Sequence, residues 1–97
     1  MPSYIILNKL TDQGAKNVKD SPKRARAAQK EAEKLGGKLT TYYTFGEYIT
    51  VNILEAPSDE AALSFVSQLV SLGNVQTTTL KAFTVEEAAK SISSKPS

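Results

Sequence analysis

The feature that most constrains the fold is the stretch over residues 42–52, near the middle of the 97-residue chain. Its Thr, Tyr, Phe, Ile and Val residues suit a pleated, half-buried surface, and Gly46 divides it into two halves. Glycine accepts a positive φ at little cost, so Gly46 followed by Glu47 predicts a two-residue type II′ turn. We therefore expect a central β-hairpin with strands over residues 38–45 and 47–55.

Alternation along the second hairpin strand separates its side chains into two faces. The face formed by Ile49, Val51 and Ile53 is purely aliphatic, and we expect it to meet helices. The opposite face of the sheet is expected to be open, and it mixes polar with apolar groups: Tyr4, Ile6, Asn8, Thr40, Tyr42, Thr44, Tyr48, Thr50, Asn52 and Leu54. This face is more apolar than the exposed surface of most monomers, which predicts that a second copy of the chain covers it. The alternative is that this face binds aromatic ligands or single-stranded nucleic acid.

Helices are predicted on both sides of the hairpin. Ser21 and Pro22 begin the first helix, because proline is favoured at the first helical position. Its buried stripe is mostly alanine, and glycines at 36 and 37 end it. Ser58 caps a second helix with a bulkier apolar stripe, which ends near Gly73. Residues 11–20 predict a structured loop with one or two helical turns, capped by Thr11.

Strands over residues 3–10 and 75–83 complete the pattern, and both are rich in β-branched residues. A short helix over residues 85–93 is expected to pack its apolar side on the body, and residues 94–97 form a frayed tail. The order β-α-β-β-α-β with a C-terminal helix is the ferredoxin-like pattern. Right-handed crossovers then place both main helices on one face of a four-stranded antiparallel sheet, in one domain of the α+β class over residues 1–97.

The composition excludes several classes of function. The chain has neither cysteine nor histidine, so disulfides, thiolate catalysis and the commonest metal ligands are excluded, and we expect no metal and no cofactor. No apolar run approaches the roughly 18 residues that span a bilayer. Residues 1–3 lead directly into a strand, which argues against a signal peptide, so we expect a cytoplasmic protein without membrane contact.

Short segments spread in order over nearly the whole chain resemble the GYD domain family: residues 4–14, 17–24, 32–37, 46–48, 55–57, 71–75 and 82–84. The family is bacterial and archaeal and largely uncharacterised. The resemblance implies a dimeric α+β barrel, and therefore a homodimer or a higher homo-oligomer. The motif that names the family usually has Asp after the tyrosine, whereas this chain has Ile49 after Tyr48. A role for an acid at that position is therefore not carried over.

The connection after the first strand is dense in polar residues, and it predicts a site for a small, anionic ligand. Lys19 and Arg24 would donate hydrogen bonds at a helix N-terminus, which favours anions. Asn8 and Tyr48 would line the pocket, with Asn17 beside them, while Gly46 sets the turn. The alternative reading of the same residues is helix capping and hydrogen bonding within the loop.

These observations favour a small-molecule binding or accessory protein. The second possibility is a cofactor-free barrel enzyme of the oxygenase or isomerase type, although the chain lacks the histidine that acid–base chemistry most often uses. The third is a nucleic-acid binder that uses the basic row of the first helix at Arg26, Lys30 and Lys34. Nucleic acid is the least favoured partner because the net charge is only +2.

Overall fold

The computed structural model describes residues 1–92; the expected tail over residues 94–97 and the last residue of the expected C-terminal helix lie outside the described residues. The elements follow the expected order: β1 (Ser3–Leu10), α1 (Asp12–Lys16), the 3₁₀ turn η1 (Val18–Asp20), α2 (Ser21–Lys34), β2 (Lys38–Tyr43), β3 (Thr50–Glu55), α3 (Asp59–Ser71), β4 (Val75–Ala82) and α4 (Val85–Ile92).

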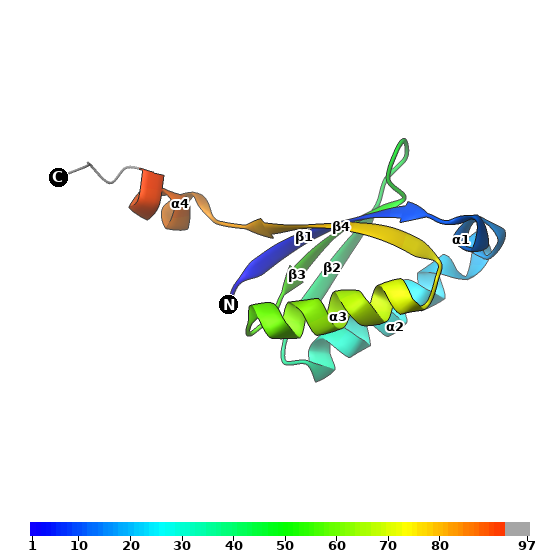
Figure 1. Ribbon diagram of the computed structural model, residues 1–97, viewed down its shortest axis with the longest axis horizontal. Coiled ribbons are helices and arrows are strands. Elements are labelled where there is room, and N and C mark those ends of the chain that lie inside the picture. The colour runs from blue at the N-terminus through cyan, green and yellow to red at the C-terminus, as the bar shows by residue number, and fades with distance from the viewer. Residues whose placement is uncertain (93–97) are drawn as a thin grey trace.

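The four strands form one antiparallel sheet in the order β2-β3-β1-β4, and α2 and α3 lie on the same side of it (Figure 1). The α+β class and the ferredoxin-like arrangement are thus confirmed. No helix within residues 1–92 combines the length and the apolarity needed to cross a bilayer. Over the same residues, no group of three or more acidic, histidine or cysteine side chains is placed to hold a metal ion.

Residues 11–20, predicted as a structured loop with one or two helical turns, contain α1 and η1. The Thr11 hydroxyl accepts a hydrogen bond from the Gly14 amide at 3.0 Å, which caps α1. Gly14 approaches the start of β4 so closely that a Cβ atom would lie 2.0 Å from the Asn74 carbonyl oxygen. A side chain at this position is excluded, so glycine is retained in α1 despite its poor helix propensity. This contact holds the end of β1 against the start of β4.

The core lies between the sheet and the two long helices. The alanine stripe of α2 packs as predicted, with Ala32 fully buried, and Phe65 is the largest core side chain of α3. The small alanine side chains let α2 approach the sheet near β2, where it contacts Leu39. From the sheet the core receives Tyr4, Ile6 and Leu54.

The expectation for the two faces of the sheet was wrong for β1 and β3, whereas Thr40 and Tyr42 of β2 lie on the open face as expected. Thr50, Asn52 and Leu54 are buried under the helices, whereas Ile53 is exposed and Val51 lies on the same open face. Polar side chains can occupy the covered face because they hydrogen-bond to one another and to the backbone. The strand register shows that the side chains of the alternate positions lie together on the open face: Ile5, Leu7, Thr40, Tyr42, Val51, Ile53, Thr78 and Leu80.

The prediction of a two-residue hairpin turn was also wrong, because β2 ends earlier and β3 begins later than expected. Residues 44–49 form the connection, which is closed by a hydrogen bond from the Thr44 amide to the Ile49 carbonyl at 2.9 Å. The Ile49 amide instead donates to the Asn8 carbonyl of β1 at 2.8 Å. Gly46 lies within this connection with a φ of 106°, a conformation that glycine adopts at little cost.

The C-terminal helix does not pack on the body as expected. It stands beyond the end of β4, away from α2 and α3 (Figure 1). Val85 and Ile92 on its apolar side are 80% and 81% exposed. Thr84 and Glu87 form a reciprocal capping box that fixes where α4 begins. The apolar side of α4 therefore lacks tertiary contact. A helix this short is marginal in water without such contact.

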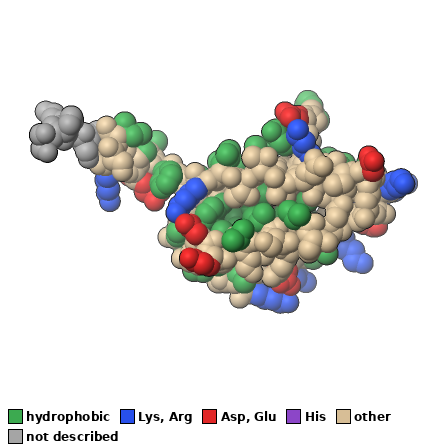
Figure 2. All heavy atoms as spheres, viewed as in Figure 1, with side chains coloured by type: hydrophobic (Ala, Val, Ile, Leu, Met, Phe, Trp, Pro, Cys, Tyr) green, Lys and Arg blue, Asp and Glu red, His purple; other side chains and the backbone are tan. Residues whose placement is uncertain are grey.

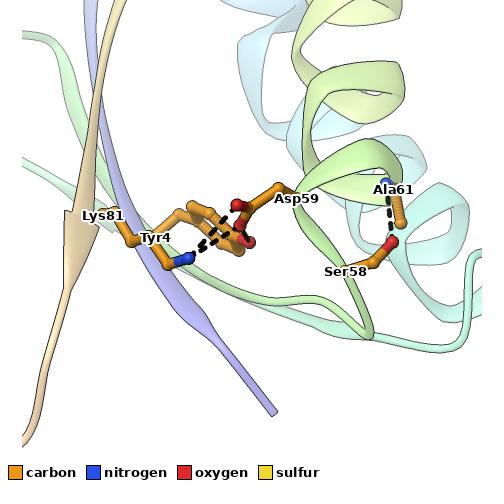
Figure 3. A network of polar contacts seen from close by, with 5 residues as sticks. All are labelled: Tyr4, Ser58, Asp59, Ala61 and Lys81. Atoms are coloured by element: carbon orange, nitrogen blue, oxygen red, sulfur yellow. Dashed lines mark hydrogen bonds and ion pairs between the residues drawn. The ribbon is translucent and has the colours of Figure 1, made fainter.

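A polar network joins the sheet to the start of α3 (Figure 3). The Tyr4 hydroxyl donates to the Asp59 carboxylate, and Lys81 Nζ lies 3.0 Å from Asp59 Oδ1. The hydrogen bond to Asp59 raises the pKa of Tyr4 to about 12, and burial adds to the shift. The bonds from Tyr4 and Lys81 lower the pKa of Asp59. The adjacent Ser58 caps the helix by accepting from the Ala61 amide at 3.1 Å.

We expect this network to make stability depend on acidic pH. Because the folded state lowers the pKa of Asp59 from 3.8, the ionised carboxylate stabilises the fold above that pH, and this contribution is lost as the pH falls through the folded value. The urea midpoint of the unaltered chain should therefore fall more between about pH 5 and about pH 2.5 than that of Asp59→Asn. The control Asp12→Asn should behave like the unaltered chain; an equal fall in Asp59→Asn would refute the role of the network.

Candidate functional site

A cavity of about 440 Å³ lies between the sheet and the helices α2 and α3. Figure 2 looks onto the side where β4 runs beside α3, and hydrophobic side chains are visible between these two elements. The cavity exists because α2 and α3 make few contacts with each other and leave the middle of the covered face unfilled. Its volume is within the range of small-molecule sites.

The walls of the cavity are largely apolar. The alanines of α2 form one wall, and the small size of their side chains leaves room above the sheet. Phe65 and Leu69 of α3 form the opposite wall, and Ile49 closes the end nearest the hairpin connection. A site of this kind would hold the apolar part of a ligand. The complete apolar lining is Leu10, Ala25, Ala27, Ala28, Leu39, Ile49, Phe65, Leu69, Leu72 and Val75.

The floor of the cavity is a network of neutral polar side chains on the three neighbouring strands β2, β3 and β1. Thr41 Oγ1 donates to Asn52 Oδ1 at 2.7 Å. Asn52 Nδ2 donates to Thr50 Oγ1 and to the Ile6 carbonyl, both at 3.2 Å. Asn8 Nδ2 also donates to Thr50 Oγ1, at 3.0 Å. The floor therefore offers amides and hydroxyls, without a formal charge.

Charged side chains occur in the part of the lining that α2 contributes. Arg24 and Glu31 both line the cavity. Arg24 Nη1 donates to the Asn17 carbonyl at 3.0 Å, which holds the guanidinium toward the turn before α2. The Ser21 and Tyr43 hydroxyls lie 2.7 Å apart and link the start of α2 to the end of β2. These contacts position polar groups around a largely apolar interior.

The structure brings together two of the five predicted ligand residues. Asn8 and Arg24 both line the cavity. Asn17 and Lys19 are exposed and lie outside its lining. Tyr48 lines a separate, shallow groove formed by the end of β1 and the connection over residues 44–49.

That groove contains the predicted motif of Gly46, Glu47 and Tyr48. Lys9 Nζ lies 2.6 Å from Glu47 Oε1 and 5.6 Å from the centre of the Tyr48 ring. The hydrogen bond to Glu47, assisted by its charge, raises the pKa of Lys9. Ile49, where the family motif usually has Asp, instead lines the main cavity, so this part of its wall carries no carboxylate.

Sequence reasoning missed much of the site. Thr50 and Asn52 were assigned to the open face, Thr41 was given no role, and Phe65 and Leu69 were assigned only to the helix stripe. The signal available in the sequence was the polar residue at every second position of adjacent strands, at Asn8, Thr50 and Asn52. Side-chain pairing of this kind requires the strand register, which the sequence alone does not supply.

The described groups with displaced pKa values lie away from the cavity lining. They are Tyr4, Lys9, Asp59 and Glu87. Capping explains Glu87, whose pKa is lowered by hydrogen bonds from the Thr84 backbone and side chain.

Comparison with known proteins identifies relatives. The chain matches the model of the GYD domain over residues 4–92. It is also 34% identical over 89 residues to a protein of Thermus thermophilus named glutamine synthetase and cystathionine beta-lyase binding protein. That similarity covers 90% of this chain and 94% of the relative. No solved structure matches the chain. The family match spans nearly all of the sequence, and the chain therefore belongs to the GYD domain family.

Proposed function

We propose that the chain is a small-molecule-binding accessory protein that works as a homo-oligomer, and that the cavity under α2 and α3 is its ligand site. The observation that carries this proposal is the combination of about 440 Å³ of space, apolar walls and a converging polar floor. Small-molecule sites have this composition, because apolar contact supplies affinity and a few polar groups fix the orientation of the ligand.

Binding explains the cavity better than catalysis does. The ionisable side chains of its lining are Arg24, Glu31 and Tyr43. General acid–base catalysis calls for a group whose pKa is tuned near the working pH, and such tuning usually comes from burial and charged neighbours. The chain has no histidine, and the Tyr43 hydroxyl and Arg24 Nη1 are bonded to Ser21 and to the Asn17 carbonyl. A cofactor-free barrel enzyme therefore remains the less favoured proposal.

Filling the cavity should abolish ligand binding. Compounds from a metabolite library that raise the thermal unfolding midpoint are expected to shift the ¹⁵N resonances of cavity residues such as Thr50 and Leu69. Ala25→Phe places a ring in the cavity wall and should remove this stabilisation, whereas Ala15→Phe, on an exposed position of α1, should retain it. Stabilisation that survives in Ala25→Phe, or shifts confined to the outer surface, would count against the site.

Self-association through the open face of the sheet is the second part of the proposal. Apolar side chains from all four strands gather on this face: Ile5, Leu7, Tyr42, Val51, Ile53 and Leu80. Their register makes a continuous cross-strand patch, with Lys9, Lys38 and Glu55 toward its margin. Packing two such sheets face to face would remove this patch from water, which is the arrangement that the family resemblance implies.

Introducing charged side chains on the open face should dissociate the oligomer into monomers. We expect light scattering to give the unaltered protein at least twice the mass of the 10.5 kDa chain. The double change Val51→Lys with Ile53→Lys should yield monomers, because lysine would have to be buried unpaired in the interface. Ser64→Lys with Ser67→Lys adds the same charge on the exposed side of α3 and should leave the oligomer intact. A monomeric unaltered chain would refute self-association.

Protein partners are a second candidate function. The relative from Thermus thermophilus is named as a binding protein of two enzymes, glutamine synthetase and cystathionine beta-lyase. In this chain the connection over residues 44–49 projects from the end of the sheet, and Phe45 at its tip is 101% exposed (Figure 1). An exposed aromatic side chain is a common anchor in protein interfaces, so Phe45 supports a contact of this kind.

The partner proposal predicts that Phe45 contributes to enzyme binding. Biolayer interferometry with the two enzymes from the same organism as this chain should give saturable binding. Phe45→Ser should weaken it at least about tenfold, as expected for loss of an aromatic anchor. Leu63→Ser removes an exposed apolar side chain from α3 and should have no effect. Absence of binding to both enzymes would confine that activity to the relative.

A further inference from the structure

Asn8 is the residue of the cavity with unused hydrogen-bonding capacity. Its side chain is on the cavity floor, and the residue is only 6% exposed. Asn8 Nδ2 donates to Thr50 Oγ1, but Asn8 Oδ1 is buried without a hydrogen-bond partner. Among the described residues it is the only buried side-chain polar atom left unpaired. Leaving a buried acceptor unpaired destabilises a fold, so such an atom requires an explanation.

The hydrogen bonds among the neighbouring residues leave Asn8 Oδ1 unpaired. Thr41 donates to Asn52 Oδ1, which orients the Asn52 amide so that its Nδ2 donates to Thr50 Oγ1 and the Ile6 carbonyl. Thr50 Oγ1 therefore already accepts two hydrogen bonds, one of them from Asn8. The network holds the Asn8 amide in place, and its oxygen remains as an acceptor in the cavity.

The surroundings of Asn8 limit the kind of molecule that would supply the donor. The floor beside it is neutral, made of the Thr41, Thr50 and Asn52 side chains. Phe65 and Leu69 provide apolar contact on the α3 side. A carboxylate head would bring an acceptor against an acceptor and would leave a charge in an apolar site. Arg24 also lines the cavity, and its Nη1 atom donates to the Asn17 carbonyl. A carboxylate bound to its other N–H groups is the competing arrangement, so the test includes an anionic probe.

We propose that the cavity binds an amphipathic molecule whose neutral head group donates an N–H or O–H hydrogen bond to Asn8 Oδ1, while its apolar body packs against Phe65 and Leu69. This inference rests on the proposed function, because it names the ligand class of the same cavity. Asn8 is the residue that selects the head group. This proposal replaces the anionic ligand that Lys19 and Arg24 suggested with a ligand whose head group is a neutral hydrogen-bond donor.

Three matched probes test this selection on the unaltered chain. 4-Phenylbutanamide has a neutral head with N–H donors, N,N-dimethyl-4-phenylbutanamide keeps the acceptor but lacks the donor, and 4-phenylbutanoate is an anion. Titration followed by ¹H–¹⁵N spectra would report each Kd and the residues affected. We expect the primary amide to bind at least about tenfold more tightly than the other two, because a site built around a polar group rejects an analogue that leaves the group unpaired. The Asn8 side-chain amide resonance should shift with the primary amide.

Variants assign the preference to Asn8. Asn8→Leu keeps a similar volume but removes the acceptor, so the primary amide and the dimethyl amide should bind with equal affinity. Asn17→Leu changes an exposed asparagine outside the cavity and should keep the preference. The comparison of probes on the unaltered chain stands even where Asn8→Leu does not fold.

The outcomes separate this inference from the proposed function. Equal binding of all three probes, with shifts at Phe65 and Leu69, would overturn the role of Asn8 and leave the cavity as a ligand site; a bound water would then satisfy Asn8 Oδ1. Tighter binding of the carboxylate would overturn the neutral head group in favour of an anion. Shifts confined to residues outside the cavity with every probe would overturn both this inference and the proposed site.

Discussion

The hydrogen-bonded row beneath the helices is the constraint on which the rest of this structure depends. Thr41, Asn52, Thr50 and Asn8 connect β2, β3 and β1 in the middle of the covered face. A slip of one residue in any of these strands would move its polar member to the opposite face and leave the others unpaired. The network thus fixes the strand register and, with it, the set of apolar side chains left on the open face.

The same row accounts for the cavity. Polar side chains on the floor are satisfied chiefly by one another, so they do not require the helices to contact them. The alanine stripe of α2 brings that helix close to the sheet at Leu39 and Ala32, while Phe65 fills part of the space on the α3 side. Between these contacts the covered face stays open. A core made only of large aliphatic side chains would close this space, because protein interiors are packed to high density.

Most of the architecture could be predicted from local signals in the sequence. The start and end of α2 are marked by a proline and by two glycines, and the start of α3 is marked by a capping serine. These signals act between neighbouring residues, so they define the order of the elements without tertiary information. The faces of the sheet could not be predicted in the same way. The rule that the more aliphatic row meets the helices assigned Val51 and Ile53 to the core, but here the polar row is satisfied internally and the aliphatic row is open. The site was affected by the same error. Asn8 and Arg24, which were expected in the pocket, line the cavity, whereas Thr50 and Asn52 were placed on the opposite face and Thr41 was given no role.

A crystal structure of the protein as purified would test the central claim most directly, since the claim concerns which row faces the helices and what it contacts. The account predicts Thr50, Asn52 and Asn8 under α2 and α3, with an open cavity above them in which Asn8 Oδ1 faces a bound molecule or water. It would be contradicted by a structure in which Val51 and Ile53 lie under the helices. It would equally be contradicted by helices closed onto the sheet, with Asn8 Oδ1 bonded to a donor from the chain itself.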